Sequence, residues 1–237
     1  MGSSENYTTF IRTGGSFGDL YGFMFKRDDQ GRIMLDETNG NPLKTAVQYD
    51  VNDWTVGYLG NLEPDFSLSW NNDVQFGNFS VGALISGKFG GKAVDHTESM
   101  LDGWGVSKRS GDARDVGYVE VDAVQGGTPV TQADPYLWYS EGKGTGGRNG
   151  IIEPYVYDRT NIRLSQFSIA YDFDVNKLNL PLKGLNFSLV GQNLFILYKK
   201  APFDPELAMN TTNSAQSLNN FNPPATRTYG FNIKVTF

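Results

Sequence analysis

The chain ends in a run that alternates strictly between apolar and polar or glycine residues, RTYGFNIKVTF, from Arg227 to Phe237. Its apolar set consists of Tyr229, Phe231, Ile233, Val235 and Phe237. Successive side chains of a β-strand point to opposite faces, so a period of two predicts a strand with one apolar face. That face has to lie against either a protein core or lipid.

Two neighbouring runs share this alternation. The run FSLSWNNDVQF has Phe66, Leu68, Trp70, Val74 and Phe76 on one face, interrupted only by Asn72. After Gly77-Asn78, a pair typical of a tight hairpin, the run from Phe79 to Phe89 continues with Phe79, Val81, Ala83, Ile85 and Phe89. Residues that flank a two-residue hairpin loop pair with each other, so Phe76 should lie beside Phe79 and the two apolar faces should coincide.

Two further strands are predicted, at about 161–173 and 185–198. In the first, the apolar phase changes between Leu164 and Phe167, and in the second it drifts around Gly191-Gln192-Asn193. A phase change inside a strand indicates a β-bulge or the rim of a sheet.

The connections between these strands alternate between short and long. Long loops are predicted at about 90–160 and 199–226, within a strand region that covers 64–237. A short helix is predicted within 92–104, and EGKGTGGRNG at 141–150 is typical of a flexible loop tip. Residues 1–63 form a separate hairpin and loop region, with a turn at Asp29-Gln30-Gly31. This layout is typical of an antiparallel up-and-down sheet with tight turns on one side.

Strand length favours lipid over a sandwich core as the partner of the apolar face. The runs 66–76, 79–89 and 227–237 each hold eleven residues, whereas sandwich strands commonly have ~5 to 6 and transmembrane strands need ~9 to 11. We therefore predict an all-β fold, with about five long strands of a larger transmembrane β-barrel and long extracellular loops. The predicted lipid-facing residues are Phe66, Leu68, Trp70, Val74, Phe76, Phe79, Val81, Ile85, Tyr229, Phe231, Ile233, Val235 and Phe237.

Composition narrows the function classes. A formal net charge of −6 argues against nucleic-acid binding, and the chain contains no cysteine for a disulfide or a thiolate metal site. No run reaches the ~18 apolar residues of a membrane-spanning helix, and MGSSENYTTF lacks the pattern of an export signal.

Few residues mark a chemical site. His96 is the single histidine, which excludes a catalytic triad and histidine clusters, and we interpret it as a loop residue. Asp28-Asp29-Gln30-Gly31 lacks the alternating ligands of a calcium loop, and no two carboxylates are marked as a glycosidase pair. We therefore expect no metal, no cofactor and no enzymatic activity. Aromatic residues of the long loop are candidates for stacking on cargo, or alternatively for packing the loop against itself: Trp104, Tyr136, Trp138, Tyr139 and Tyr155.

Four motifs resemble one family when taken together. They are SGKFGGK at 86–92, GQNLF at 191–195, PFDPE at 202–206 and the closing RTYGFNIKVTF. Their order and spacing resemble the carboxy-terminal part of SusC/RagA-type TonB-dependent receptors of the Bacteroidetes, from about Gly14 onward. The resemblance implies a plugged barrel in the Gram-negative outer membrane that imports oligosaccharides or peptides. It also implies a SusD-like surface lipoprotein and TonB as partners, and a terminal strand that the barrel assembly machinery reads.

The chain departs from this family in what it lacks. Neither a TonB box nor a plug domain is found, so TonB would act through a missing amino-terminal region. About five strands also fall short of the ~22 of a plugged transporter. We therefore expect a fragment or one piece of a split receptor. The alternatives are a soluble all-β carbohydrate-binding module and a glycan hydrolase, which would need a carboxylate pair.

Overall fold

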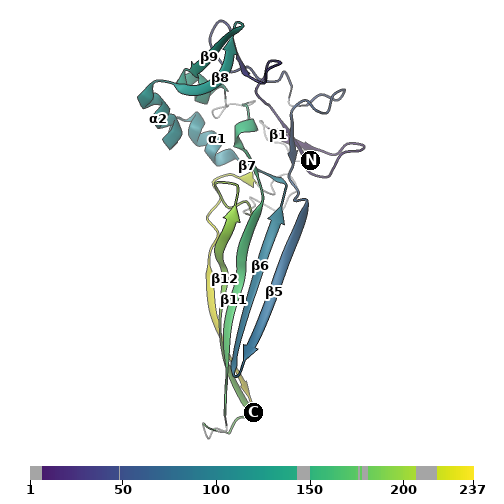
Figure 1. The fold of residues 1–237 in the computed structure, drawn as a ribbon, viewed down its shortest axis with the longest axis vertical. Helices are drawn as coiled ribbons and strands as arrows, with labels where there is room; N and C mark the ends of the chain where they lie inside the picture. The colour runs from purple at the N-terminus through teal and green to yellow at the C-terminus, as the bar shows by residue number, and fades with distance from the viewer. Residues whose placement is uncertain (1–6, 48, 143–149, 176, 178–180, 207–217) are drawn as a thin grey trace. The chain divides into compact units, whose positions relative to one another are not determined.

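A computed structural model describes residues 7–47, 49–142, 150–175, 177, 181–206 and 218–237 (Figure 1). The chain forms two compact units. The sheet unit comprises Pro64–Gly90, Arg159–Asp204 and Pro223–Phe237, and the loop unit comprises Met1–Glu63, Gly91–Asp158 and Pro205–Asn222. Each unit is therefore built from segments that are distant in the sequence.

The sheet unit is a five-stranded antiparallel sheet in the order β14-β12-β11-β6-β5 (Figure 1). Its strands are β5 (Phe66–Phe76), β6 (Phe79–Phe89), β11 (Asn161–Phe173), β12 (Gly184–Lys199) and β14 (Thr228–Thr236). All five long strands predicted from the alternation are confirmed, with ends that differ by one residue at most. Phe76 pairs with Phe79 across the Gly77-Asn78 turn, as the hairpin geometry predicts.

A β-bulge accounts for the phase change in β11. Leu164 pairs with Ile85 and Gln166 pairs with Leu84, so Ser165 is an extra residue opposite β6. On the other side, Leu164 pairs with Phe195 and Gln166 with Gln192, so the register of β12 shifts at the same level. The extra residue restores the apolar side chains to one face after the shift.

In its described part, the loop unit contains three small sheets. Their orders are β1-β2-β4, β10-β7-β13 and β3-β8-β9. The strand bounds are β1 (Tyr7–Phe10), β2 (Asp19–Gly22), β3 (Ile33–Leu35), β4 (Tyr58–Asn61), β7 (Lys92–Asp95), β8 (Val119–Gln125), β9 (Thr128–Ala133), β10 (Val156–Asp158) and β13 (Leu218–Asn219). The predicted turn at 29–31 is confirmed, because the Asp28 backbone N–H donates to the Arg32 carbonyl (3.0 Å) and Arg27 bridges to Ile33.

Two α-helices follow β7. The helix α1 (His96–Gly103) begins after Asp95, whose side chain accepts a hydrogen bond from the Glu98 backbone N–H. The prediction of a helix within 92–104 is thus confirmed for its second part, whereas Lys92–Asp95 is the strand β7. The helix α2 (Lys108–Val116) begins after the capping residue Ser107 and ends at Gly117, whose positive φ of 89° suits glycine.

A π-helix (Leu137–Gly142) and a 3-10 helix (Glu153–Tyr155) complete the loop unit. Most of the predicted loop tip at 141–150 lies outside the described residues. No helix among the described residues is both long and apolar enough to span a membrane.

Two clusters of buried apolar residues lie in the loop unit. Its first cluster contains Tyr7, Leu20, Leu62, Val94, Ile152, Tyr155 and Leu218. Its second contains Phe25, Leu35, Ala123, Ala133, Trp138, Tyr139 and Ile151. The sheet unit contributes no residue to either cluster of the described residues, so its own apolar face does not close around a core.

Candidate functional site

One face of the sheet unit carries continuous apolar rows that cross all five strands. One row, in spatial order, is Phe76, Phe79, Tyr171, Phe187 and Ile233. The next row is Val74, Val81, Ile169, Leu189 and Phe231. Because the register aligns these residues strand by strand, we call this surface the apolar face.

The apolar face is strongly exposed. Phe76 is 85% exposed, Phe231 72% and Ile233 56%. Of the residues predicted to face lipid, Ile85 is partly exposed and the others are all exposed. A continuous exposed apolar patch across five strands of a folded protein marks a surface that contacts another protein or a membrane.

The opposite face of the same sheet is polar. One of its rows, in spatial order, is Gln75, Ser80, Ala170, Ser188 and Asn232. Beside it, the Asn186 side-chain amide donates to Asp172 Oδ1 at 2.8 Å, and Asn186 pairs with Lys234. The sheet therefore separates an apolar side from one that suits water.

Residues of three of the four family-like motifs meet in the sheet unit. Asn193 and Phe195 of GQNLF, Asp204 of PFDPE and Arg227 of the terminal motif line one cavity of about 100 Å³. Arg163 of β11 forms an ion pair with Asp204 there (2.7 Å), and both side chains are almost fully buried. The pair ties the segment after β12 to β11.

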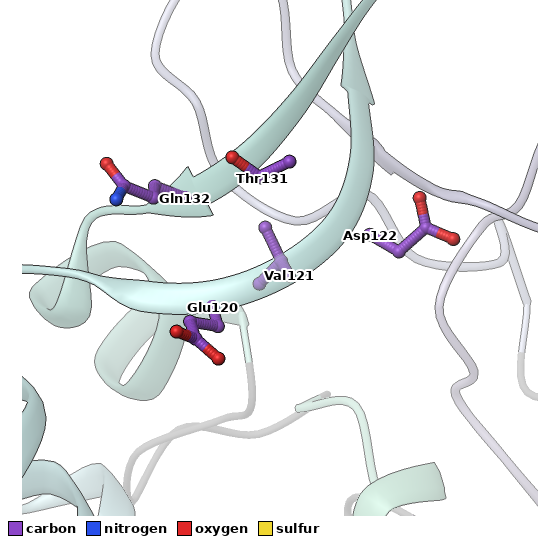
Figure 2. A pocket seen from close by; sticks show the side chains of 5 residues that line it. All are labelled: Glu120, Val121, Asp122, Thr131 and Gln132. Carbon is purple, nitrogen blue, oxygen red and sulfur yellow. The ribbon is translucent and has the colours of Figure 1, made fainter.

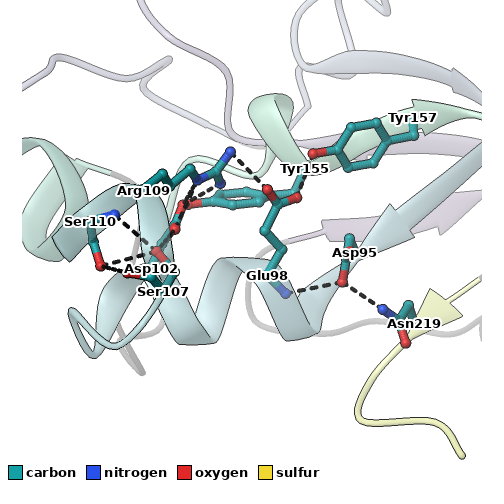
Figure 3. A network of polar contacts seen from close by, with 9 residues as sticks. All are labelled: Asp95, Glu98, Asp102, Ser107, Arg109, Ser110, Tyr155, Tyr157 and Asn219. Atoms are coloured by element: carbon teal, nitrogen blue, oxygen red, sulfur yellow. Dashed lines mark hydrogen bonds and ion pairs between the residues drawn. The ribbon is translucent and has the colours of Figure 1, made fainter. Parts of the chain in front are cut away.

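The loop unit contains a dense ionic network around Asp102, shown in Figure 3. The Asp102 side chain is fully buried and accepts hydrogen bonds from Arg109 Nε (2.8 Å), Ser107 Oγ (2.6 Å) and the Tyr155 hydroxyl (2.8 Å). Arg109 also contacts Glu98 (2.8 Å), and Glu98 accepts from the Tyr157 hydroxyl. The network therefore joins α1, the start of α2 and β10.

Burial and hydrogen bonding have opposite effects on the pKa of Asp102. Burial by itself raises the pKa of Asp102, but the bonds from Arg109, Ser107 and Tyr155 outweigh it and hold the pKa below its ordinary value. Burial and the nearby Asp102 carboxylate raise the pKa of Tyr155. At neutral pH the network is thus an ionised Asp102 beside a neutral Tyr155 and a charged Arg109.

The five aromatic candidates fall into two groups. Trp138, Tyr139 and Tyr155 are buried, and the Trp138 ring stacks on Phe25 at 5.2 Å, which favours the packing alternative for these three. Trp104 and Tyr136 are exposed and line one cavity of the loop unit. Only these two present rings to a ligand.

The single histidine begins α1 and does not lie in a loop, so our interpretation was wrong on that point. Its ring is partly buried, and burial lowers the pKa of His96. In the described part of the chain, no three acidic or histidine side chains converge as metal ligands.

A second hollow of the loop unit lies on the hairpin β8–β9. It measures about 420 Å³ and is lined by Glu120, Val121, Asp122, Thr131 and Gln132. Figure 2 shows the Glu120 and Asp122 carboxylates pointing in different directions. The hollow therefore lacks the facing carboxylates that glycoside hydrolysis needs.

Comparison of the sequence with known proteins finds a relative that matches nearly the whole chain. No family model matches it. The chain is homologous to part of TonB-dependent receptor P3 of Formosa agariphila, with 24% identity over 98% of the chain. It spans 23% of the length of that receptor.

Solved structures of a RagAB peptide importer share the fold. The 'open-open' state matches with a TM-score of 0.56 and 13% identity, over 98% of this chain and 24% of that one. The 'closed-closed' state matches with a TM-score of 0.53 and 12% identity, over 98% of this chain and 25% of that one. These relatives are a receptor and an importer, in agreement with the prediction that the chain is not an enzyme.

Proposed function

We propose that the chain is the carboxy-terminal barrel portion of a TonB-dependent importer in a Gram-negative outer membrane. The observation that carries the proposal is the apolar face, whose rows cross all five strands while the reverse face is polar. Homology to a quarter of a TonB-dependent receptor supports the same reading. The sheet would form part of the barrel wall, with lipid on the apolar face.

The two edge strands of the sheet support the proposal that further strands complete the barrel wall. Among the residues that the structure describes, β5 and β14 lie at the two edges of the five-stranded sheet, and each pairs on one side only. Unpaired backbone groups inside a bilayer cost several kcal/mol each, which is why membrane sheets close into barrels. Strands from the rest of a longer receptor would pair with both edges.

The loop unit would lie outside the cell. We propose that residues 1–63 and the long loops at about 90–160 and 199–226 are extracellular, because the tight β5–β6 turn at Gly77-Asn78 is typical of the periplasmic side. We propose that a surface lipoprotein of the SusD type covers them, by analogy with the RagAB importer whose fold the chain shares. TonB would act through a region that precedes these residues in the complete receptor, and the cargo would be a peptide or an oligosaccharide.

Membrane extraction tests this proposal. Expressed within its complete receptor, the chain should sediment with the outer membrane, resist washing with carbonate and salt, and dissolve only in detergent. The isolated chain should aggregate without detergent, because the apolar face and both edges would be exposed. A soluble and monodisperse isolated chain would instead identify a soluble all-β module.

A further inference from the structure

We infer that the loop unit carries a binding subsite for a carboxylate-bearing cargo, formed by Trp104, Tyr136 and Arg114. The inference rests on the proposed import function and specifies the chemistry of the cargo. The subsite is a cavity of about 160 Å³ between the end of α1, the helix α2 and the segment after β9. Its lining includes both exposed aromatic rings of the long loop and a guanidinium group.

The two aromatic rings of the subsite are exposed to solvent, and the Trp104 ring also contacts a neighbouring aromatic ring. Trp104 is 55% exposed and Tyr136 is 68% exposed. The Trp104 ring stacks on Phe221, with centroids 6.4 Å apart and an interplanar angle of 20°. Phe221 has a positive φ of 52°, and its backbone N–H donates to Thr97 Oγ1 at 2.6 Å. The Phe221 main chain is thus held at α1, and its ring stacks on the Trp104 ring.

Arg114 supplies the charge at the mouth of the cavity. Its Nη1 donates to the Gly105 carbonyl at 2.6 Å, and its other N–H donors have no partner among the described residues. Gly105 has φ +69°, and a Cβ atom there would lie 2.8 Å from Arg114 Nη1. The glycine thus leaves room for the guanidinium, which is oriented by one bond while several donors stay available.

The carboxylates near the cavity are engaged by partners other than Arg114. Asp102 lines the cavity, but its carboxylate already accepts from Ser107, Arg109 and Tyr155. On α2, Asp112 is paired with Lys108. Arg114 is the one basic side chain among the described residues that line the cavity.

A flat aromatic surface beside an oriented guanidinium suits one kind of ligand. Arginine binds carboxylates through paired N–H donors, and aromatic rings pack against flat apolar surfaces. The shared chemistry is a carboxylate next to an apolar face. A uronic-acid unit of an oligosaccharide offers this chemistry, and so does an acidic residue or a free carboxyl end of a short peptide.

Binding titrations on the complete receptor in detergent micelles test the subsite. The probes are tetragalacturonate with neutral galactotetraose, and an acidic tetrapeptide with its fully amidated form. We expect one charged probe to bind at least tenfold tighter than its neutral counterpart. Trp104→Ala and Tyr136→Ala should each weaken that binding at least tenfold, and Trp104→Phe should largely restore it. Arg114→Gln should bring the charged and neutral probes to within twofold, and Lys26→Gln, at an exposed lysine of the loop unit that does not line this cavity, should leave the preference unchanged.

The outcomes separate the subsite from the import proposal. Preference for the uronate or for the peptide identifies the source of the carboxylate and supports the subsite. Equal binding of all probes, or an unchanged charge preference in Arg114→Gln, overturns the subsite. Either of those results, obtained with a receptor that still inserts into membranes, leaves the barrel proposal standing. Failure of the unmodified receptor to insert overturns the barrel proposal itself.

Discussion

Three side chains, Arg109, Ser107 and Tyr155, donate hydrogen bonds to the buried carboxylate of Asp102. Its partners come from the start of α2 and from the 3-10 helix that precedes β10. A hydrogen bond to a charged group contributes more than one between neutral groups, and a buried carboxylate that loses a donor keeps its desolvation cost. The network therefore fixes the two helices that frame the cavity beside Trp104.

The two tyrosines of the network give a matched pair of substitutions. Tyr155→Phe removes the donor to Asp102 from a fully buried site and should lower the stability of the loop unit by about 1.5 to 3 kcal/mol. Tyr157→Phe removes the donor to the more exposed Glu98 and should cost about 1 kcal/mol or less. Hydrogen exchange of the α1 amides in the complete receptor measures both. Equal losses of protection would contradict the central role of Asp102.

Two carboxyls near α1 should respond to acid with opposite signs. Asp102 has a lowered pKa, so its stabilisation is present above the unfolded value of ~3.9 and is lost as pH falls through the folded value. Burial raises the pKa of Asp95, so its effect is opposite, and acid favours its folded form. Asp102→Asn should therefore flatten the acid-induced loss of α1 protection, whereas Asp95→Asn should steepen it. Hydrogen exchange corrected for intrinsic pH dependence tests this, and a shift of both variants in the same direction would refute it.

The candidate site was only partly predictable at this scale. Trp104 and Tyr136 are two of the five aromatic candidates identified from the sequence, and the structure exposes both. The burial of Trp138 could not be predicted, because it stacks on Phe25, a residue far away in the sequence. Arg114 also escaped notice, since its place beside Gly105 depends on the turn between α1 and α2. A glycine and an arginine nine residues apart in a polar stretch carry no sequence pattern that predicts their contact.

At the scale of elements, the long strands were predictable and the short ones were not. A period of two over eleven residues is a local signal, and β5 and β6 begin and end where it does. The helix α2, KRSGDARDV, has a capping serine but no apolar stripe, so its sequence lacks the usual helical pattern. Strands such as β7 and β13 hold together through partners distant in sequence, which no local pattern reveals.

Substitution and deletion of Ser165 test the β-bulge in β11. Deleting Ser165 removes the extra residue opposite β6 and shifts part of β11 by one position, which turns its apolar side chains to the polar face. We expect the deletion to reduce the yield of folded receptor severely. Ser165→Ala keeps the residue count and loses only the contact with Ser86, so its yield should stay near that of the unmodified receptor. Resistance of the folded barrel to unfolding in cold detergent, read from gel mobility, compares the two, and a well-folded deletion variant would contradict the register.

At the scale of the whole molecule, the two units use apolar residues differently. The loop unit buries its apolar residues in two clusters, as a water-exposed region does. The sheet unit leaves exposed large side chains such as Trp70, Leu189 and Phe231 on one face. The sequence alone allowed a sandwich core behind that face. Under the proposed function, lipid covers that face instead.

Accessibility of adjacent positions in β14 tests the membrane-facing sheet most directly. Ile233 lies in an apolar row beside Phe187, whereas Lys234 pairs with Asn186 on the polar face. A nitroxide would be attached to a cysteine introduced at each position in turn, in the complete receptor reconstituted into bilayers. We predict high access of oxygen and low access of a nickel chelate at 233, and the reverse at 234. If neither reagent reaches 233, that side chain is packed in a protein core, and the lipid-facing assignment of the sheet is wrong.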